Sequence, residues 1–211
     1  NRRVYIAKSN WSEYTHATED IAALVWAVRV IRDERERAAA MADVAKRTLA
    51  TLPPDTKVAL FAHATQVSRR PEDHGMGALL AADLKKQYLP IGMTFYQGWI
   101  RAWDFTKDPG AERGTKLFRL APAEPGTLES LLAGAGASMF YADVRKAPPS
   151  LAPWFSAPLP MRSVGAAFES DRRARTRTVV KDAFDGLVFV KKLTTVRVTE
   201  TGKRPAQREW D

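Results

Sequence analysis

The stretch that most constrains the fold runs from Thr51 to Gly77, where a short apolar run leads into a histidine. Pro53-Pro54-Asp55 opens it with a turn signal, because proline fixes φ and aspartate tolerates tight turns. Residues 57–62 (KVALFA) are mostly apolar between polar neighbours, which is typical of a strand buried on both faces of a parallel sheet. Open α/β sheets place ligands beyond the carboxyl ends of such strands. His63 follows this run, can titrate near neutral pH, and is therefore the first catalytic candidate.

Composition limits the classes of protein and of site. With 45% hydrophobic residues and six tryptophans, the chain can bury a substantial core. No apolar run approaches the roughly 18 residues of a membrane span, so we expect no membrane partner. The absence of cysteine excludes disulfides and thiol nucleophiles. It also permits a reducing compartment, so the location stays open with the cytoplasm favoured. The three histidines are too scattered for a metal motif, and we expect no metal and no cofactor.

The net charge of +9 raises the alternative of a nucleic-acid-binding protein. The run Arg172–Arg177 contains four arginines and no acid. A nucleic-acid site would set such a run among aromatic residues or on a recognition helix, and neither pattern is present. A solvated arginine-rich loop is the favoured interpretation.

The pattern from residue 18 predicts a helix with one apolar stripe. Thr18 suits an N-cap, and apolar residues then recur at i, i+3, i+4, i+7 and i+10 from Ile21 to Ile31. The charged block at residues 32–37 interrupts the stripe, which resumes at Met41. The sequence leaves open one long helix with a solvated middle or two helices that break near Asp33.

The remaining elements alternate between helix and strand. This order predicts an α/β fold, with a mainly parallel β-sheet flanked by helices. We expect helices over residues 77–87 and 128–132, loops over 98–114 and 147–160, and strands over 57–62, 88–95, 115–120, 138–144, 161–165, 184–190 and 194–198.

Several short strings, in this order and spacing, resemble the second half of the erythromycin esterase family. Phe61-Ala62-His63-Ala64-Thr65-Gln66 is similar to that family's tryptophan-alanine-histidine-asparagine-x-histidine motif, and Met76-Gly77 to the pair that opens its next helix. The strings that complete the match are Arg37 with Met41-Ala42, Gly126-Thr127-Leu128-Glu129, residues 184–189 (FDGLVF) and Thr194-Thr195. The resemblance implies an N-terminal remnant or linker at residues 1–17, a family domain (its C-terminal half) at 18–198, and a polar tail at 199–211.

The resemblance also implies an activity of the antibiotic-resistance type in bacteria. By this resemblance, a histidine would act as general base on water, without a metal, to open an ester such as a macrolide lactone. The chain departs from the motif, since Ala64 stands for its asparagine and Gln66 for its second histidine. By resemblance the main base belongs to the family's first half. This chain would then hold only the C-terminal half of a site, and its partners would be a small ester or lactone and that missing half.

The sequence is compatible with two main functions. As a hydrolase, the chain would use His63 in catalysis, with Gln66, Arg37, Met76 and Tyr96 as substrate-binding candidates. Gln66 can hydrogen-bond but cannot titrate. As a catalytically degenerate family member, motivated by Ala64 and Gln66, the chain would serve as a binding module. No G-x-S-x-G elbow or phosphate-binding glycine loop supports a serine hydrolase or an NTPase.

Overall fold

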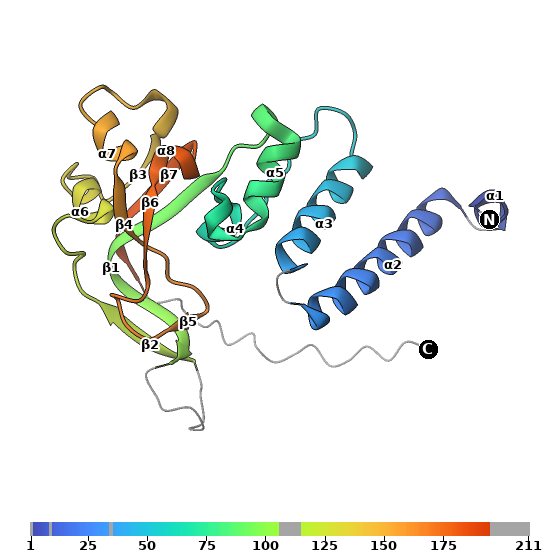
Figure 1. Cartoon of the computed structure of the whole chain (residues 1–211), viewed down its shortest axis with the longest axis horizontal. Coiled ribbons are helices and arrows are strands. Elements are labelled where there is room, and N and C mark those ends of the chain that lie inside the picture. The colour runs from blue at the N-terminus through green and yellow to red at the C-terminus, as the bar shows by residue number, and fades with distance from the viewer. Residues whose placement is uncertain (1, 9, 34–35, 106–114, 195–211) are drawn as a thin grey trace. The chain divides into compact units, whose positions relative to one another are not determined.

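The computed structural model describes residues 2–8, 10–33, 36–105 and 115–194, and they divide into two compact units. The first unit takes residues up to 92 together with 181–186, and the second takes 93–180 together with the chain from 187. Each unit is described by itself below (Figure 1). The strand expected at 194–198 lies almost wholly outside the described residues.

The first unit is helical. Its elements are α1 (Arg2–Lys8), α2 (Trp11–Arg32), α3 (Arg37–Thr51), α4 (Ala64–Val67), the 3-10 turn η2 (Pro71–Asp73), α5 (Met76–Leu84), the 3-10 turn η3 (Lys85–Gln87) and α8 (Val180–Ala183), which begins at the boundary.

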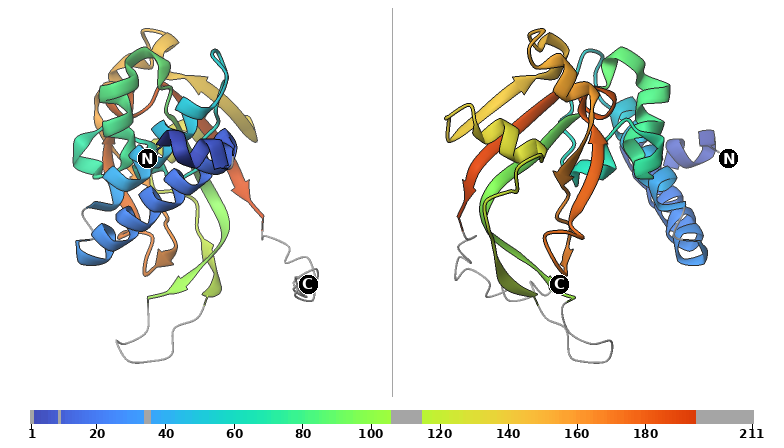
Figure 2. Two further views of the ribbon diagram at one scale, coloured as in Figure 1. Left: turned by 90° about the vertical axis from the view of Figure 1, so that its right-hand side faces the viewer. Right: turned by 60° about the vertical axis from the view of Figure 1, so that its left-hand side comes forward.

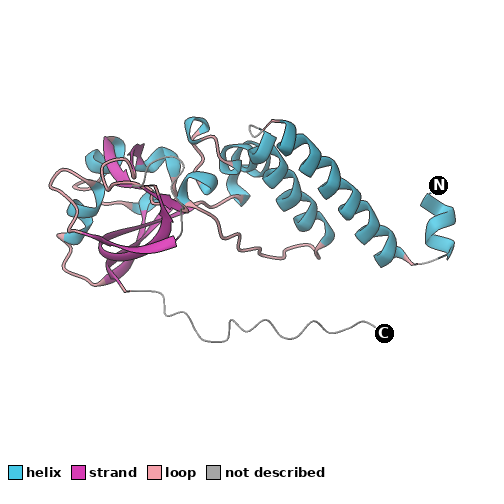
Figure 3. Ribbon diagram, turned by 90° about the horizontal axis from the view of Figure 1, so that it is seen from below, coloured by secondary structure: helices cyan, strands magenta, loops and turns pink. Residues whose placement is uncertain are grey.

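Two helices, and not one, occupy the region of the charged block. Asp33 ends α2 in an extended conformation, and α3 begins at Arg37. Helix α2 also begins earlier than Thr18, because the side chain of Asn10 accepts a hydrogen bond from the backbone N–H of Glu13 and caps it. The two helices lie side by side (Figure 3), where Trp26 Nε1 donates to Asp43 Oδ2 over 2.7 Å.

The apolar stripe of α2 is exposed. Trp26 points to α3, whereas the stripe residues remain largely in solvent, Ile31 with 84% of its surface exposed. Pattern alone identifies an amphipathic helix but not the surface that covers it. The stripe therefore marks a face that nothing in the described part of the first unit buries; its members are Ile21, Leu24, Val25, Val28 and Ile31.

The prediction of a strand at residues 57–62 is wrong. The turn before it is present, with Asp55 at φ 66° and Thr56 N–H donating to Pro53 O. Residues 57–62 are extended but belong to no sheet, and Phe61 is 92% exposed. A strand needs a neighbouring backbone to take up its N–H and C=O groups, and the described residues provide none here. The described residues before β1 therefore add no strand to the sheet, contrary to the expected alternation of helix and strand in this part of the chain.

The second unit is built on β-sheets. Its elements are β1 (Ile91–Asp104, which starts at the unit boundary), β2 (Thr115–Leu120), α6 (Leu128–Ala133), β3 (Met139–Asp143), the 3-10 turn η4 (Val144–Lys146), α7 (Ala152–Ser156), β4 (Pro158–Arg162), β5 (Ala167–Phe168), β6 (Arg175–Val179) and β7 (Gly186–Leu193). The larger sheet has the order β2-β1-β7-β3, with β5 on β1, and β4 pairs with β6 separately.

The expected fold class is confirmed: this is a mixed α/β fold with a central sheet flanked by helices. The sheet is not purely parallel, since β1 pairs with β5 in parallel and with β2 antiparallel. Strand β1 is long and curved (Figure 2). It extends to Asp104, into the region expected as a loop from Gly98. The loop expected over 147–160 is also wrong in part, because it contains α7 and the start of β4.

One buried apolar cluster of the second unit lies between β1, β2 and β5. Ala102, Leu120 and Phe168 are buried together, and the rings of Phe118 and Phe168 lie 4.7 Å apart. Lys116 Nζ pairs with the buried carboxylate of Asp104 over 2.6 Å. Strands β1 and β2 pair in antiparallel register, with Trp103 opposite Thr115 and Gly98 opposite Leu120.

Candidate functional site

His63 lies where the extended segment 57–62 turns into α4. It is the N-cap residue of that helix, and its ring Nδ1 accepts a hydrogen bond from the backbone N–H of Thr65 over 3.4 Å. The hydroxyl of Thr65 lies 2.8 Å from the same nitrogen. The ring is half-buried. The contacts from Thr65 thus hold the imidazole of His63 at its Nδ1 edge.

The residues after α4 fix this turn within the first unit. Tyr88 Oη donates to the carbonyl of Val67 over 2.7 Å, and burial raises the pKa of Tyr88 to about 12. The guanidinium of Arg69 pairs with Asp185, while Arg69 N–H donates to Ala183 O over 3.1 Å. Ser68 is fully buried between these contacts. Contacts from distant parts of the sequence therefore anchor the His63 turn.

Glycines at the start of α5 bring this helix against the backbone of α4. A Cβ at Gly75 would lie 2.2 Å from Thr65 O, and one at Gly77 would lie 2.3 Å from Ser68 O. Both distances are far below van der Waals contact. The Met76-Gly77 pair thus has a physical role, since the helix can begin here only without a side chain facing α4.

Gly77→Ala is expected to destabilise the protein by about 1–3 kcal/mol, because the new methyl group would push two backbone segments apart. Gly165→Ala is the matched control, since nothing lies within 4 Å of its Cβ position, and it should change stability by less than about 0.5 kcal/mol. Urea unfolding of both variants measures this. Equal midpoints for the two would contradict the close approach of α5 to α4.

Gln66 carries a buried acceptor without a partner. Its Oε1 is closed off from solvent and has no hydrogen bond among the residues that the structure describes, although the residue as a whole is half-buried. An unpaired buried amide oxygen costs about 1–3 kcal/mol. A donor from a ligand or from water would satisfy it.

The other expected site residues have different positions. Met76 is 1% exposed and is a core residue of the first unit. Arg37 is exposed at the start of α3. Tyr96 belongs to the second unit, where its backbone carbonyl accepts from Arg162. The α4–α5 region of the first unit thus contains His63, Gln66 and Met76, whereas Arg37 lies on α3 and Tyr96 lies in the second unit.

Among the described residues, no group of three or more His, Cys, Asp or Glu side chains could hold a metal ion. No described helix is long and apolar enough to span a membrane. In the basic run, Arg173 pairs with Glu169, and Arg175 with Asp171 and Glu124. These pairs use carboxylates of the chain itself, so part of the run is already neutralised.

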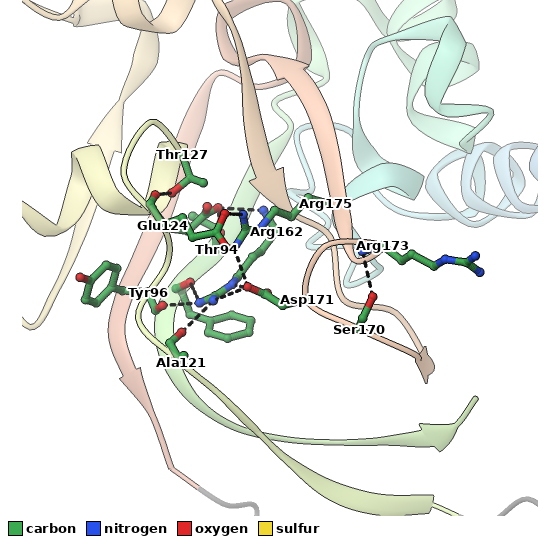
Figure 4. Close-up of polar contacts among 12 residues, drawn as sticks. Thr94, Tyr96, Ala121, Glu124, Thr127, Arg162, Ser170, Asp171, Arg173 and Arg175 are labelled. Atoms are coloured by element: carbon green, nitrogen blue, oxygen red, sulfur yellow. Dashed lines mark hydrogen bonds and ion pairs between the residues drawn. The ribbon is translucent and has the colours of Figure 1, made fainter. Parts of the chain in front are cut away.

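The second unit contains a buried polar network that the sequence does not predict. The side chain of Arg162 is fully buried in β4 and donates to both carboxylate oxygens of Asp171, at 2.8 and 3.0 Å. It also donates to Ala121 O over 2.8 Å and to Tyr96 O (Figure 4). Burial alone would raise the pKa of Asp171, but the hydrogen bonds and charges of Arg162 and Arg175 lower it. Arg162 thereby joins β1, the segment after β2, and the loop before β6.

Glu129 is buried beside this network in the first turn of α6. One carboxylate oxygen accepts from Thr94 Oγ1 over 2.5 Å and from Arg162 N–H over 2.9 Å. Its other oxygen is buried without a hydrogen bond among the described residues. Burial raises the pKa of Glu129, and these hydrogen bonds offset that effect only in part.

Glu129 is expected to make stability pH-dependent. Because its pKa in the folded state lies above that of the unfolded chain, its contribution is fully present below the unfolded value and is lost as pH rises through the folded value. Glu129→Gln should therefore gain stability relative to the wild type as pH increases from about 4 to 8. Thermal midpoints at several pH values measure this, with the exposed Glu169→Gln as control. A constant difference between wild type and Glu129→Gln would contradict it.

Comparison with known proteins identifies the family. The family model for erythromycin esterase matches residues 3–193. Among curated proteins, none matches the chain significantly. Three solved structures share the fold: a protein from Bacillus cereus (23% identity, TM-score 0.66), a succinoglycan biosynthesis protein (19%, 0.61), and a mutant of erythromycin esterase EreC in its open conformation (21%, 0.59).

These structural matches cover 77%, 74% and 90% of this chain, but only 39%, 38% and 50% of the three solved chains. The chain therefore spans half or less of the length of these relatives. At such identities the structures support the fold alone. The family assignment depends instead on the model match, which extends over both units and includes the His63 turn and the Arg162 network. The chain belongs to the erythromycin esterase family.

Proposed function

We propose that this chain forms part of an enzyme that hydrolyses an ester or lactone, with His63 in its active site. The observation that carries the proposal is the placement of His63. It is the N-cap of α4, half-buried, with one ring edge occupied by Thr65. The turn thereby gives the ring a fixed orientation. Membership of a hydrolase-type family supports the reaction class.

In the proposed reaction, water adds to the ester carbonyl and a histidine takes the proton that the water loses. The C–O bond to the alcohol then breaks, and the alkoxide receives a proton. By resemblance the main general base belongs to the part of family proteins that this chain does not match. His63 completes the site from this chain, and the side-chain amide of Gln66 lies on the same helix, α4. The proposal requires no metal or organic cofactor.

We further propose that the rest of a longer family protein covers two exposed surfaces of the first unit. These are the extended segment 57–62, with Phe61 exposed, and the apolar stripe of α2. Apolar surface of this kind is costly to leave in water, and the solved relatives are at least twice the length of this chain's match. The gene sequence upstream of Asn1 tests this. Hydrogen exchange should then slow at the amides of residues 57–62 when the encoded upstream segment is present.

A binding module without catalysis is the second candidate, favoured by Ala64 and Gln66 at two motif positions. One experiment separates the two functions. The protein is incubated with chromogenic esters and with a macrolide lactone, and products are analysed by mass spectrometry while binding is measured by calorimetry. Gain of one water in the product supports the hydrolase. Saturable binding of a ligand that stays chemically unaltered would contradict the hydrolase and support the binding module.

A further inference from the structure

We infer that the outward face of the β1–β2 pair binds single-stranded nucleic acid. In this inference Trp99 and Trp103 stack on bases, and Arg101 and Arg119 contact phosphates. It goes beyond the proposed hydrolysis and uses no residue of the His63 turn, so either conclusion can fail without the other. It depends on the register of the two strands, on the exposure of their side chains and on their charge.

The register of β1 and β2 gathers aromatic and basic side chains on one face. Side chains alternate between the two faces of a sheet, and directly paired residues share a face. Ala102 and Leu120 belong to the buried cluster, so the residues next to them along each strand point outward. The outward face therefore consists of three cross-strand pairs: Trp99 with Arg119, Arg101 with Leu117, and Trp103 with Thr115.

The outward face is open to solvent. Trp103 exposes 47% of its surface, and Trp99 and Leu117 each expose 39%. Arg101 and Arg119 are exposed as well. Single exposed apolar residues are common on protein surfaces, whereas neighbouring ones that form a patch indicate a binding surface.

The face carries positive charge that the described residues leave unneutralised. Among them, neither Arg101 nor Arg119 forms an ion pair. No aspartate or glutamate stands at any of the six outward positions. The nearest acid of β1, Asp104, lies on the buried face and pairs with Lys116. A guanidinium without a carboxylate partner is well suited to a phosphate, so the partner of this face is an anion.

The spacing of the side chains favours nucleic acid over other anions. At about 3.4 Å per residue, the two tryptophans lie about 14 Å apart along β1, with Arg101 midway between them. Arg119 lies across from Trp99 on β2, about 5 Å away. Each indole can thus stack on a separate base while the guanidinium groups contact the linking phosphates. Proteins bind single strands with this combination of aromatic and basic side chains.

Other anions fit the face less well. A polycarboxylate would satisfy the two arginines but would offer no ring to the tryptophans. A duplex hides its bases within its own stack. The basic run Arg172–Arg177 lacks aromatic neighbours in the sequence, and the pairing of β1 with β2 supplies the combination that this run lacks.

Fluorescence anisotropy with labelled oligomers of thymidine and of uridine tests the inference on the full chain. Saturable binding is expected, and it should weaken steeply between about 50 and 200 mM salt. A duplex of the same length should bind less tightly. Trp99→Ala and Trp103→Ala should each weaken binding by about 5- to 150-fold, the range for one base stacked on an aromatic ring. Arg101→Ala should lower the slope of the salt dependence by about 0.7.

Two exposed residues elsewhere in the second unit are matched controls. Trp154→Ala removes a tryptophan of α7 that is 46% exposed, and Arg172→Ala removes an exposed arginine of the basic run. Both should bind like the wild type. The double variant Trp99→Leu/Trp103→Leu keeps apolar surface but removes both rings, so it should lose affinity as the alanine variants do. Thermal unfolding verifies that each variant is folded.

Several results would overturn the inference. These are absence of single-strand binding at low salt, equal affinity for the duplex, and unchanged affinity in the folded double leucine variant. Equal losses in Arg172→Ala and Arg101→Ala would assign binding to the basic run instead. Tighter binding of polyglutamate or of phosphatidylserine vesicles than of the oligomers would contradict nucleic acid and indicate an acidic protein or an anionic membrane.

Discussion

His63→Ala is expected to lower the rate of ester hydrolysis by about 10²–10⁴-fold, the range for a positioned acid–base group. If His63 acts only as a hydrogen-bond donor to the oxyanion, the loss should lie near 10²–10³-fold. Stability should change modestly, because the ring is half-buried and its contacts lie within one turn. Activity and thermal unfolding are measured on the same preparation.

His63→Gln separates the two chemical roles of this residue. Glutamine keeps a side-chain N–H donor but cannot titrate. Partial recovery of activity relative to His63→Ala would indicate hydrogen-bond donation, and no recovery would indicate proton transfer by His63. His16→Ala, on the exposed surface of α2, is the matched control and should retain full activity. Full activity in a folded His63→Ala protein would remove His63 from the mechanism.

Arg162→Ala is expected to destabilise the protein by about 3 kcal/mol, the lower part of the range for breaking a buried ion pair. The loss is large because Asp171 would lose both bonds from Arg162, and the carbonyls of Tyr96 and Ala121 would lose a donor. It lies at the lower end because the side chain of Asp171 remains 30% exposed and retains Arg175. Urea unfolding at neutral pH gives the value.

Two variants sharpen this measurement. Arg162→Lys keeps the charge but cannot form the paired hydrogen bonds to Asp171, so it should remain strongly destabilised. Arg173→Ala breaks an ion pair of which both members are exposed, and such pairs contribute little. An Arg162→Ala protein as stable as Arg173→Ala would contradict the structural role of the network.

Sequence predicted best the elements that local pattern determines. The strand at 115–120 has the predicted bounds, and α6 begins one residue after Thr127, whose hydroxyl accepts from Ser130 N–H and caps the helix. Asp33 separates two helices, which the charged block left as one of two options. Each of these features depends on residues within a few positions along the chain.

The wrong predictions depend on contacts across long sequence distances. Residues 57–62 have the composition of a buried strand, but composition cannot provide a neighbouring strand. The α2 stripe has helical periodicity, but periodicity does not tell what covers it. Strand β1 continues past Gly98, where the backbone of Leu193 approaches so closely that a Cβ would come within 2.3 Å of its carbonyl oxygen. That neighbour lies 95 residues away along the chain.

The candidate site was predictable only in part. The sequence predicts His63 from the apolar run before it and from the family motif. The family match confirms the resemblance, while the role of His63 stays a prediction. Arg162 and Glu129 had no local signal, because a single arginine in a short strand and a single glutamate in a first helical turn are usually exposed. Only the tertiary structure brings the backbone nitrogen of Arg162 within 2.9 Å of a carboxylate oxygen of Glu129.

The most direct test of the proposed hydrolase is the product formed in water labelled with heavy oxygen. The longest product of the gene that contains this chain is incubated with a macrolide lactone or a simple ester, as wild type and as His63→Ala with its folded fraction verified by thermal unfolding. The proposal predicts one labelled oxygen in the carboxylate product of the wild type and at least about a 10²-fold slower appearance in the variant. The same rate of labelling in both folded proteins, or bound but uncleaved ligand with the wild type, would contradict it.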